Sequence, residues 1–217
     1  MQLFSRSGGS NFDQKSMTCT LEEILEVKPV TGRQESQILT LKELHARYQF
    51  KPIRIVETGT IRNPLPRYRM GDGWATWTWL LWAKASQSHV WTCDLDPNAI
   101  ATCRLVTDNS PYIEYVNSDS VAFLESFAET IHLLYLDSFD TGPPGDPRVK
   151  EACKHQLREI EAAYDRLDDD ALVVLDDVPK DQKNGKAEFS IPFLIDRGWE
   201  ILSHMETQVI LSRKKCD

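Results

Sequence analysis

The stretch from Ile53 to Thr76 decides the fold, and it reads IRIVETGT, IRNPLPRYRM and GDGWAT. Its first part is a short apolar run with β-branched residues, which predicts a buried strand that ends near Glu57 and Gly59. Its last part opens with two glycines, the second being Gly73, and leads into an apolar segment, which predicts a buried helix. Strand, glycine-bearing turn and helix form the first unit of many nucleotide-cradling α/β folds, because glycines let the backbone approach a ligand. Many ordinary turns also carry two glycines, so the rest of the chain has to support this prediction.

The chain downstream repeats the alternation of strand and helix. Short apolar runs end in polar clusters and are followed by segments with helical periodicity, and a last pair of runs predicts a hairpin. The predicted strands after the first are residues 89–94, 112–116, 131–137, 171–175, 199–203 and 208–212. We therefore predict an α/β fold, a Rossmann-like doubly wound sheet of seven strands with one antiparallel edge strand and helices on both faces.

The domain organisation follows from the polarity of the N-terminal part. Residues 1–17 are polar and contain glycine and serine, so we expect a flexible tail. Residues 18–50 predict two helices, one over 21–27 and one over 34–48, and we expect this helical segment to cover the site. Residues 51–217 form the α/β domain in this prediction.

The composition is that of an ordinary globular protein and argues against several classes of protein. The 217 residues carry a net charge of −8 and a pI near 5.2, which argues against sequence-independent binding to nucleic acid or to an anionic membrane. Apolar runs fall short of the roughly 18 residues of a spanning helix, and the N-terminus lacks the apolar region of a secretory signal. The five cysteines show no CxxC or zinc spacing, so we expect reduced thiols and a cytoplasmic protein.

Acids at the predicted strand ends are candidates for ligand contacts, because doubly wound sheets bind ligands at the carboxyl ends of their strands. Asp94 ends the second strand, where an acid can accept hydrogen bonds from ribose hydroxyls. Asp119 lies in the polar cluster 117–120 after the third strand. Helix capping is the alternative explanation at both places, since Asp96 before Pro97 fits a cap and the cluster can cap the next helix.

Four tryptophans gather after Gly73, at positions 74, 77, 79 and 82. Such a group could form a stacking platform for bases or sugars. The helix that carries them is apolar nearly all round, so we favour plain burial between the sheet and its neighbours. Trp74, beside the glycines, is the one that we keep as a ligand contact.

Taken together, these landmarks resemble a class I S-adenosylmethionine-dependent methyltransferase over residues 50–212. IVETGT with GDGWAT is similar to the glycine-bearing first motif of that family, TCDLDPNAIATC to its second motif, and NSDS to its adenine-side turn. One departure is an insert in the glycine loop that includes Arg62, Arg67 and Arg69. The resemblance implies S-adenosylmethionine as cofactor, and the cofactor-binding residues are then Glu57, Gly59, Thr60, Gly73, Trp74, Asp94 and Asp119.

Three acids end two neighbouring strands of the predicted sheet, Asp137 after the fourth and Asp176 and Asp177 after the fifth. Ionising three close carboxylates is costly without a cation, and oxygen ligands suit Mg²⁺. We therefore predict these three acids as ligands of Mg²⁺ or another divalent cation. Loop solvation or helix capping is the alternative for Asp176 and Asp177. A second alternative is that Arg62 or Arg69 folds over the acids and neutralises them.

The acids resemble those of metal-dependent O-methyltransferases, both the catechol type and the macrolide and aminocoumarin sugar type. Asp140 stands where the catechol type has a lysine base and Asp177 where it has an asparagine, so the chain looks closer to the sugar-modifying type. The resemblance implies transfer to a metal-bound hydroxyl with Asp137 and Asp140 as catalytic residues, Asp140 taking the proton. His155 and Lys180 are less favoured as bases, and we expect His155 at the surface of its helix.

The predicted function is S-adenosylmethionine-dependent methyl transfer to a hydroxyl of a small molecule or sugar. The sequence leaves two other classes open. One is a metal-independent methyltransferase that acts on a nitrogen or on a nucleotide-linked acceptor, and the other is a non-catalytic binding protein on the same scaffold. The identity of the acceptor and the association of copies into a homo-oligomer are also left open.

Overall fold

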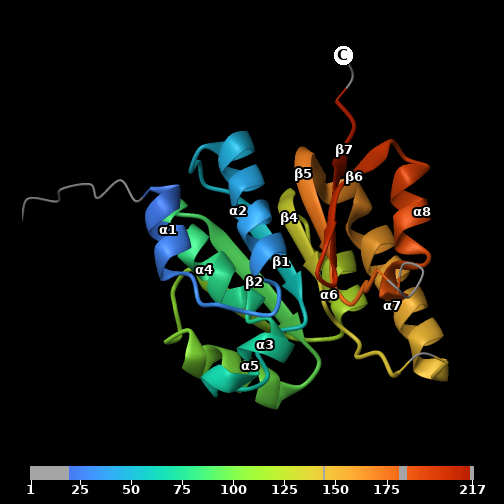
Figure 1. Ribbon diagram of the computed structural model, residues 1–217, viewed down its shortest axis with the longest axis horizontal. Helices are drawn as coiled ribbons and strands as arrows, with labels where there is room; N and C mark the ends of the chain where they lie inside the picture. Colours follow the sequence, from blue (N-terminus) through green and yellow to red (C-terminus); the bar gives the residue numbers. More distant parts are fainter. Residues whose placement is uncertain (1–19, 144, 181–184, 216–217) are drawn as a thin grey trace, which may run out of the picture.

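The structure is a computed structural model that describes residues 20–143, 145–180 and 185–215, and the predicted tail over 1–17 lies outside them. Its framework is a mixed sheet of seven strands in the order β3-β2-β1-β4-β5-β7-β6 (Figure 1). This sheet confirms the predicted Rossmann-like fold. The strands are β1 (Arg54–Thr58), β2 (His89–Asp94), β3 (Ile113–Asn117), β4 (Ile131–Leu136), β5 (Leu167–Leu175), β6 (Trp199–Met205) and β7 (Gln208–Arg213).

The predicted hairpin forms the antiparallel side of the sheet. Strand β7 runs antiparallel to both of its neighbours, β5 and β6. The turn at Glu206 and Thr207 folds β7 back between β5 and the edge, so the antiparallel strand lies one place in from the edge strand β6.

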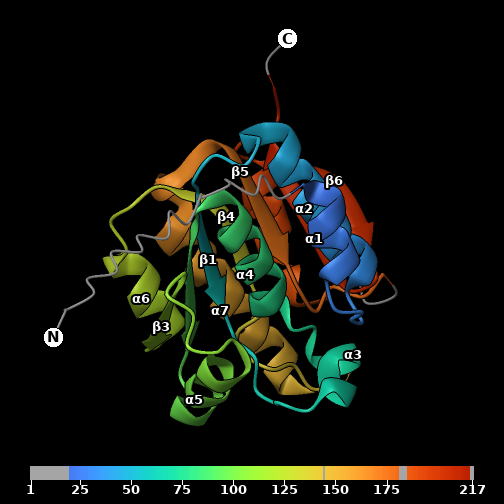
Figure 2. The same ribbon diagram turned by 90° about the vertical axis from the view of Figure 1, so that its left-hand side faces the viewer.

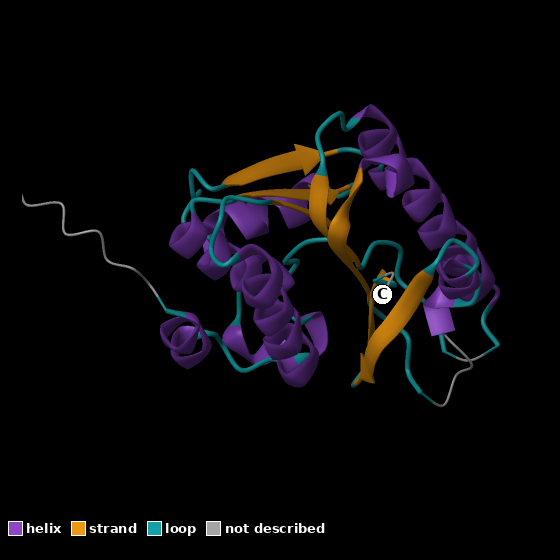
Figure 3. Ribbon diagram, turned by 90° about the horizontal axis from the view of Figure 1, so that it is seen from above, coloured by secondary structure: helices purple, strands orange, loops and turns teal. Residues whose placement is uncertain are grey.

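Helices cover both faces of the sheet (Figure 3). Three short 3-10 helices are present in the described part of the chain: η1 (Pro66–Tyr68), η2 (Tyr164–Arg166) and η3 (Gly185–Ala187). The α-helices are α1 (Leu21–Val27), α2 (Gln34–Tyr48), α3 (Arg69–Asp72), α4 (Ala75–Ser86), α5 (Pro97–Val106), α6 (Ser120–Ser126), α7 (Pro147–Ala163) and α8 (Ser190–Ile195).

Each face of the sheet buries its own apolar cluster, because successive side chains of a strand point to opposite faces. Ile55 of β1 joins the cluster under α1, α2, α4 and α5. Its neighbour Val56 joins the cluster under α6, α7 and α8. Trp79 and Trp82 of α4 are fully buried in the first cluster, which confirms plain burial for most of the tryptophan-bearing helix.

Short polar residues start the helices that follow the strands. Asp96 caps α5 through the N–H of Asn98, with Pro97 at the first helical position, as predicted. Asp119 caps α6 in the same way. These caps direct the chain from each strand end into the next helix.

Strand β5 is longer than predicted, because it begins at Leu167 rather than at Ala171. Its first part contains the acids 168–170, a composition that does not indicate a strand. The ladder with β4 shifts its register between Leu167 and Leu172, and this irregularity accommodates the acids, of which Asp169 and Asp170 are exposed.

Two further predictions concern membrane spans and the state of the cysteines. Within the described ranges, no helix combines the length and apolarity needed to cross a membrane. The three cysteines that the structure describes, Cys93, Cys103 and Cys153, are buried and free, as expected for reduced thiols.

The strand order reverses at β1, which pairs with β2 on one side and with β4 on the other. The carboxyl ends of these parallel strands lie at one edge of the sheet, the lower edge in Figures 1 and 2, where α3 and α5 also lie. Ligands of doubly wound sheets bind at such a switch point.

Candidate active site

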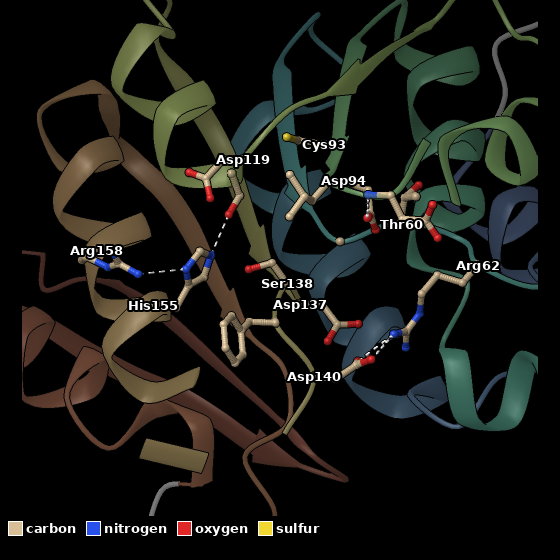
Figure 4. Close-up of a pocket in the computed structure, with 15 residues that line it drawn as sticks. Thr60, Arg62, Cys93, Asp94, Asp119, Asp137, Ser138, Asp140, His155 and Arg158 are labelled. Carbon is tan, nitrogen blue, oxygen red and sulfur yellow. Dashed lines mark hydrogen bonds and ion pairs between the residues drawn. The ribbon is translucent and has the colours of Figure 1, made fainter. Parts of the chain in front are cut away.

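A cavity of about 590 Å³ opens at this edge of the sheet. Its wall comes from the connections after β1, β2, β3 and β4 and from α7 (Figure 4). The volume lies within the range of about 300–1,000 Å³ that is usual for small-molecule sites. Six of the predicted site residues line the cavity, namely Gly59, Thr60, Asp94, Asp119, Asp137 and Asp140.

Gly59 forms the turn where the ends of β1 and β4 approach each other. Its φ is +79°, a left-handed conformation that disfavours residues with a Cβ. A Cβ at this position would also overlap the carbonyl oxygen of Asp137. Only glycine fits here, and its bare backbone is left beside the cavity.

Glu57 is absent from the cavity lining described here and is 2% exposed. Its Oε2 accepts hydrogen bonds from the hydroxyls of Thr76 at 2.6 Å and Thr92 at 2.7 Å. Thr92 also lies 2.8 Å from the hydroxyl of Thr60, which lines the cavity. Glu57 therefore ties the turn after β1 to β2 and α4, and it acts on the cavity through Thr60.

Asp94 ends β2 in a half-buried position on the cavity wall. Its Oδ1 accepts the N–H of Asp96 at 2.9 Å. Burial raises the pKa of the Asp94 carboxyl, and this backbone hydrogen bond opposes the rise. Asp94 keeps a position from which it can accept hydrogen bonds from a ligand, while Asp96 caps α5.

Asp119 is a helix cap and also borders the cavity. Its Oδ1 accepts the N–H of Ala122 at 3.0 Å, which caps α6, and the side chain also lines the cavity. Ser120 follows it on the wall, and its hydroxyl lies 2.8 Å from Nε2 of His155 on α7 (Figure 4).

Helix α7 contributes two cavity residues: His155, the less favoured candidate base, and Arg158, which the sequence did not single out. His155 is 7% exposed, so the expectation of a surface position was wrong. Beneath it Glu159 is fully buried and accepts the hydroxyl of Ser138 at 2.5 Å. A signal was available in the sequence, because His155 and Glu159 share a helical face with Ala152 and Ala163, and small residues at helical spacing indicate a buried face.

Gly73 and Trp74 lie outside the cavity lining. The carbonyl of Gly73 accepts the side-chain N–H of Gln37 at 2.9 Å. The ring of Trp74 packs against the guanidinium of Arg69, whose carbon lies 4.3 Å from the ring centroid. The insert over 61–70 folds into η1 and the start of α3, so the glycine turn at the cavity is the one at Gly59.

Asp137, Asp176 and Asp177 meet at the ends of β4 and β5, as predicted. One carboxylate oxygen of each lies within 4.8 Å of the others. Two cationic side chains already reach this acid cluster, Arg33 from the N-cap position of α2 and Lys186 from η3. The sequence indicated neither of them.

Asp176 has no exposed surface, and five groups donate hydrogen bonds to its two oxygens. A carboxylate offers about four lone-pair sites, so no oxygen of Asp176 is left for a metal ion. Burial raises the pKa of this carboxyl, but Arg33 and the donors outweigh it and hold the pKa below its usual value. The donors are Arg33 Nε at 3.1 and 3.2 Å, the Asp177 N–H at 2.7 Å, Thr207 at 3.0 Å, Tyr135 at 2.7 Å and Gln208 at 2.9 Å.

Lys186 is 1% exposed and lies between the other two acids. Its Nζ is 3.5 Å from Asp137 Oδ1, 3.2 Å from Asp177 Oδ2 and 2.8 Å from the carbonyl of Ser138. Burial lowers the pKa of Lys186, but the acids outweigh it and raise the pKa above its usual value. Burial and the charge of Asp176 raise the pKa of Asp137. In this arrangement the acids do not fit a divalent ion, which would have to displace both cations.

Asp140, the predicted proton acceptor, lies at the cavity and contacts the insert. Nη1 of Arg62 is 2.7 and 2.6 Å from its two oxygens (Figure 4). An arginine of the insert thus pairs with an acid, but with Asp140 rather than with the acid cluster. Both side chains are at least half exposed, so the pair can open at little cost.

The fold, rather than the sequence, has recognisable relatives. No protein-family model matches the chain, and no curated sequence is detectably similar to it. The O-methyltransferase NovP matches with a TM-score of 0.60 and 14% identity over 85% of this chain and 80% of that one. The SAH-bound methyltransferase PaMTH1 from Podospora anserina matches with 0.57 and 13% over 90% and 88%. The N-methyltransferase NodS from Bradyrhizobium japonicum WM9 matches with 0.52 and 11% over 83% and 93%.

These identities are low, so the likeness establishes the fold. The chain has the Rossmann-like fold of class I S-adenosylmethionine-dependent methyltransferases. The structures with this fold include both O- and N-methyltransferases, so the fold leaves the acceptor atom open.

Proposed function

We propose that the chain is an S-adenosylmethionine-dependent methyltransferase that acts on a hydroxyl of a small molecule or sugar. The observation that carries the proposal is the cavity at the switch point of the sheet. Its wall holds Gly59 and Thr60 after β1, Asp94 after β2 and Asp119 after β3. PaMTH1, which shares the fold, is SAH-bound, and SAH is the product that remains when this cofactor has given up its methyl group.

The residues of the cavity fit this cofactor. Gly59 lines the cavity, and in this proposal its backbone lies beside the methionine part. Asp94, Asp119 and Ser120 line the cavity. In this proposal Asp94 accepts hydrogen bonds from the ribose hydroxyls, and Asp119 and Ser120 lie beside the adenine. When bound, the cofactor supplies an electrophilic methyl group. The chain's own contribution is to bind both reactants, align them and exclude water.

Asp140 is the proton acceptor in this proposal, and Asp137 orients the acceptor hydroxyl deeper in the cavity. Arg62 contacts both oxygens of Asp140, so it has to turn aside before Asp140 can reach the hydroxyl. The exposure of this pair allows that movement. His155 is the second base to test, because it lines the same cavity.

In the predicted reaction a metal ion assists the transfer, but two cationic side chains contact the acids that would bind it. The sequence predicts Mg²⁺ at Asp137, Asp176 and Asp177, whereas Arg33 and Lys186 contact these acids. Metal-independent transfer, to a hydroxyl or to a nitrogen, is therefore the second candidate function. The two cations are the observation that favours it.

Calorimetry with SAH tests cofactor binding without knowledge of the acceptor. We expect one saturable site that is weakened in Asp94→Ala. Transfer of a labelled methyl group to a panel of sugars, small phenols and amines, with and without chelator, then identifies the acceptor class and the role of metal. A folded chain that does not bind SAH at millimolar concentration would contradict the proposal and favour a non-catalytic scaffold.

A further inference from the structure

We infer that Arg33 and Lys186 take the place of a divalent cation in the acid cluster of Asp137, Asp176 and Asp177, so that the chain binds no divalent metal there. The inference concerns the ion content of the site. It goes beyond the proposed function and holds whether or not the chain transfers a methyl group.

Arg33 bridges two of the three acids. Its Nε lies 3.2 and 3.1 Å from the two oxygens of Asp176, and its Nη2 lies 3.5 Å from Asp177 Oδ1. Its Nη1 donates to the carbonyl of Gly71 at 3.0 Å, and this third contact further restrains the guanidinium. A planar guanidinium held by several hydrogen bonds loses little further freedom when it binds carboxylates, which makes it a strong partner.

Lys186 bridges Asp137 and Asp177. Its Nζ stands between Asp137 and Asp177, and the carbonyl of Ser138 accepts its hydrogen bond at 2.8 Å. The side chain is 1% exposed, so water cannot replace these contacts. A buried ammonium needs such partners because an unpaired buried charge is strongly unfavourable.

The charges explain why a metal is not needed. Arg33 and Lys186 together carry two positive charges, the same as one Mg²⁺. A bound Mg²⁺ would have to displace these two cations or else double the positive charge beside the three carboxylates, and it would have to break the hydrogen bonds of Asp176 to obtain an oxygen. Mg²⁺ also sheds its water reluctantly. Each of these costs opposes binding.

The first test uses the unaltered chain and Mn²⁺, whose free form gives a paramagnetic resonance signal that is lost on binding. Asp177→Asn is the comparison, because it removes a carboxylate that a metal site here would need. We expect the same Mn²⁺ binding curve for both proteins up to millimolar metal. One equivalent of Mn²⁺ bound in the micromolar range by the unaltered chain, and lost in Asp177→Asn, would overturn the inference.

The second test removes one cation. Lys186→Gln should gain Mn²⁺ binding at least tenfold over the unaltered chain, because Asp137 and Asp177 lose their ammonium partner. Lys180→Gln, the same change at an exposed lysine six positions earlier in the sequence, should gain none. Absence of gain in a folded Lys186→Gln would contradict the inference. If that variant does not fold, the comparison with Asp177→Asn decides alone. Failure to bind SAH would count against the proposed function and leave the Mn²⁺ result standing.

Discussion

The two halves of the sheet's carboxyl edge use their acids in opposite ways. On the side of β1 to β3, Asp94 and Asp119 each accept a backbone N–H and border an open cavity. On the side of β5, Asp176 is enclosed by side-chain donors that include Arg33. The residue type and its place at a strand end are the same. The difference shows that the residue type and its place at a strand end do not decide whether an acid is open to a ligand; enclosure by donors from other elements does.

We call the side of β5 the closed half of this edge and the side of β1 to β3 the open half. The largest effect is expected from removing the cation that pairs with Asp176 in the closed half. Arg33→Met leaves Asp176 buried without its cation and should lower the free energy of unfolding by about 3–5 kcal/mol. Urea denaturation measures the loss. Arg62→Met makes the same chemical change in the exposed pair with Asp140 and should cost less than about 1 kcal/mol. Equal losses in the two variants would show that enclosure of the charge does not matter.

The next effect concerns the turn that joins the halves. Gly59→Ala places a Cβ against the carbonyl of Asp137 and strains a φ of +79°. Gly198→Ala is the matched control, because it strains a φ of +83° without any atom near the added Cβ. Overpacking typically costs about 1–3 kcal/mol, so Gly59→Ala should lose that much more stability than the control, and it should also weaken SAH binding. Similar thermal unfolding of the two variants would contradict the close approach.

Within the open half, Asp94→Ala should weaken SAH binding by roughly 1–3 kcal/mol, the cost of losing a charged hydrogen bond. Calorimetry measures this. Asp96→Ala removes the cap of α5 and should cost about 1 kcal/mol of stability with a smaller effect on binding. Unchanged affinity in Asp94→Ala would remove Asp94 from the binding site.

The smallest effect is a dependence on pH. The folded-state pKa of Asp176 lies below its unfolded value, so its contribution to stability is complete above the unfolded value of about 3.9 and is lost as the pH falls through the folded pKa. On acidification below about pH 4, the unaltered chain should therefore lose stability more steeply than Asp176→Asn. Parallel curves of unfolding free energy against pH would show that Asp176 does not titrate in this way.

Much of the fold was predictable because its signals are local. The apolar run before Gly59 and the Asp96–Pro97 cap each act within a few residues, and together they set where a strand ends and a helix begins. The convergence of Asp94, Asp119 and Asp137 was predictable as well, since parallel strands deliver their carboxyl ends to one edge of the sheet.

The closed half was not predictable, because its partners are distant in sequence. Arg33 lies 143 residues before Asp176, in a stretch whose only local signal is the start of a helix. Lys186 lies in a short 3-10 helix with no periodic pattern. Gly73 was misplaced relative to the cavity for a related reason, because nothing in the insert indicated how far its fold would carry the second glycine.

The distance between Arg33 and Asp176 has a consequence for protein synthesis. Ribosomes add about 5–20 residues per second, so the 143 residues between the two take about 7–30 s to translate. Throughout that interval the guanidinium lacks its carboxylate partners, and α2 cannot bind to a strand that has not been made. The final docking of α2 therefore has to follow the synthesis of β5, and also that of β7, because the hydroxyl of Ser36 lies 2.6 Å from the side chain of Gln208.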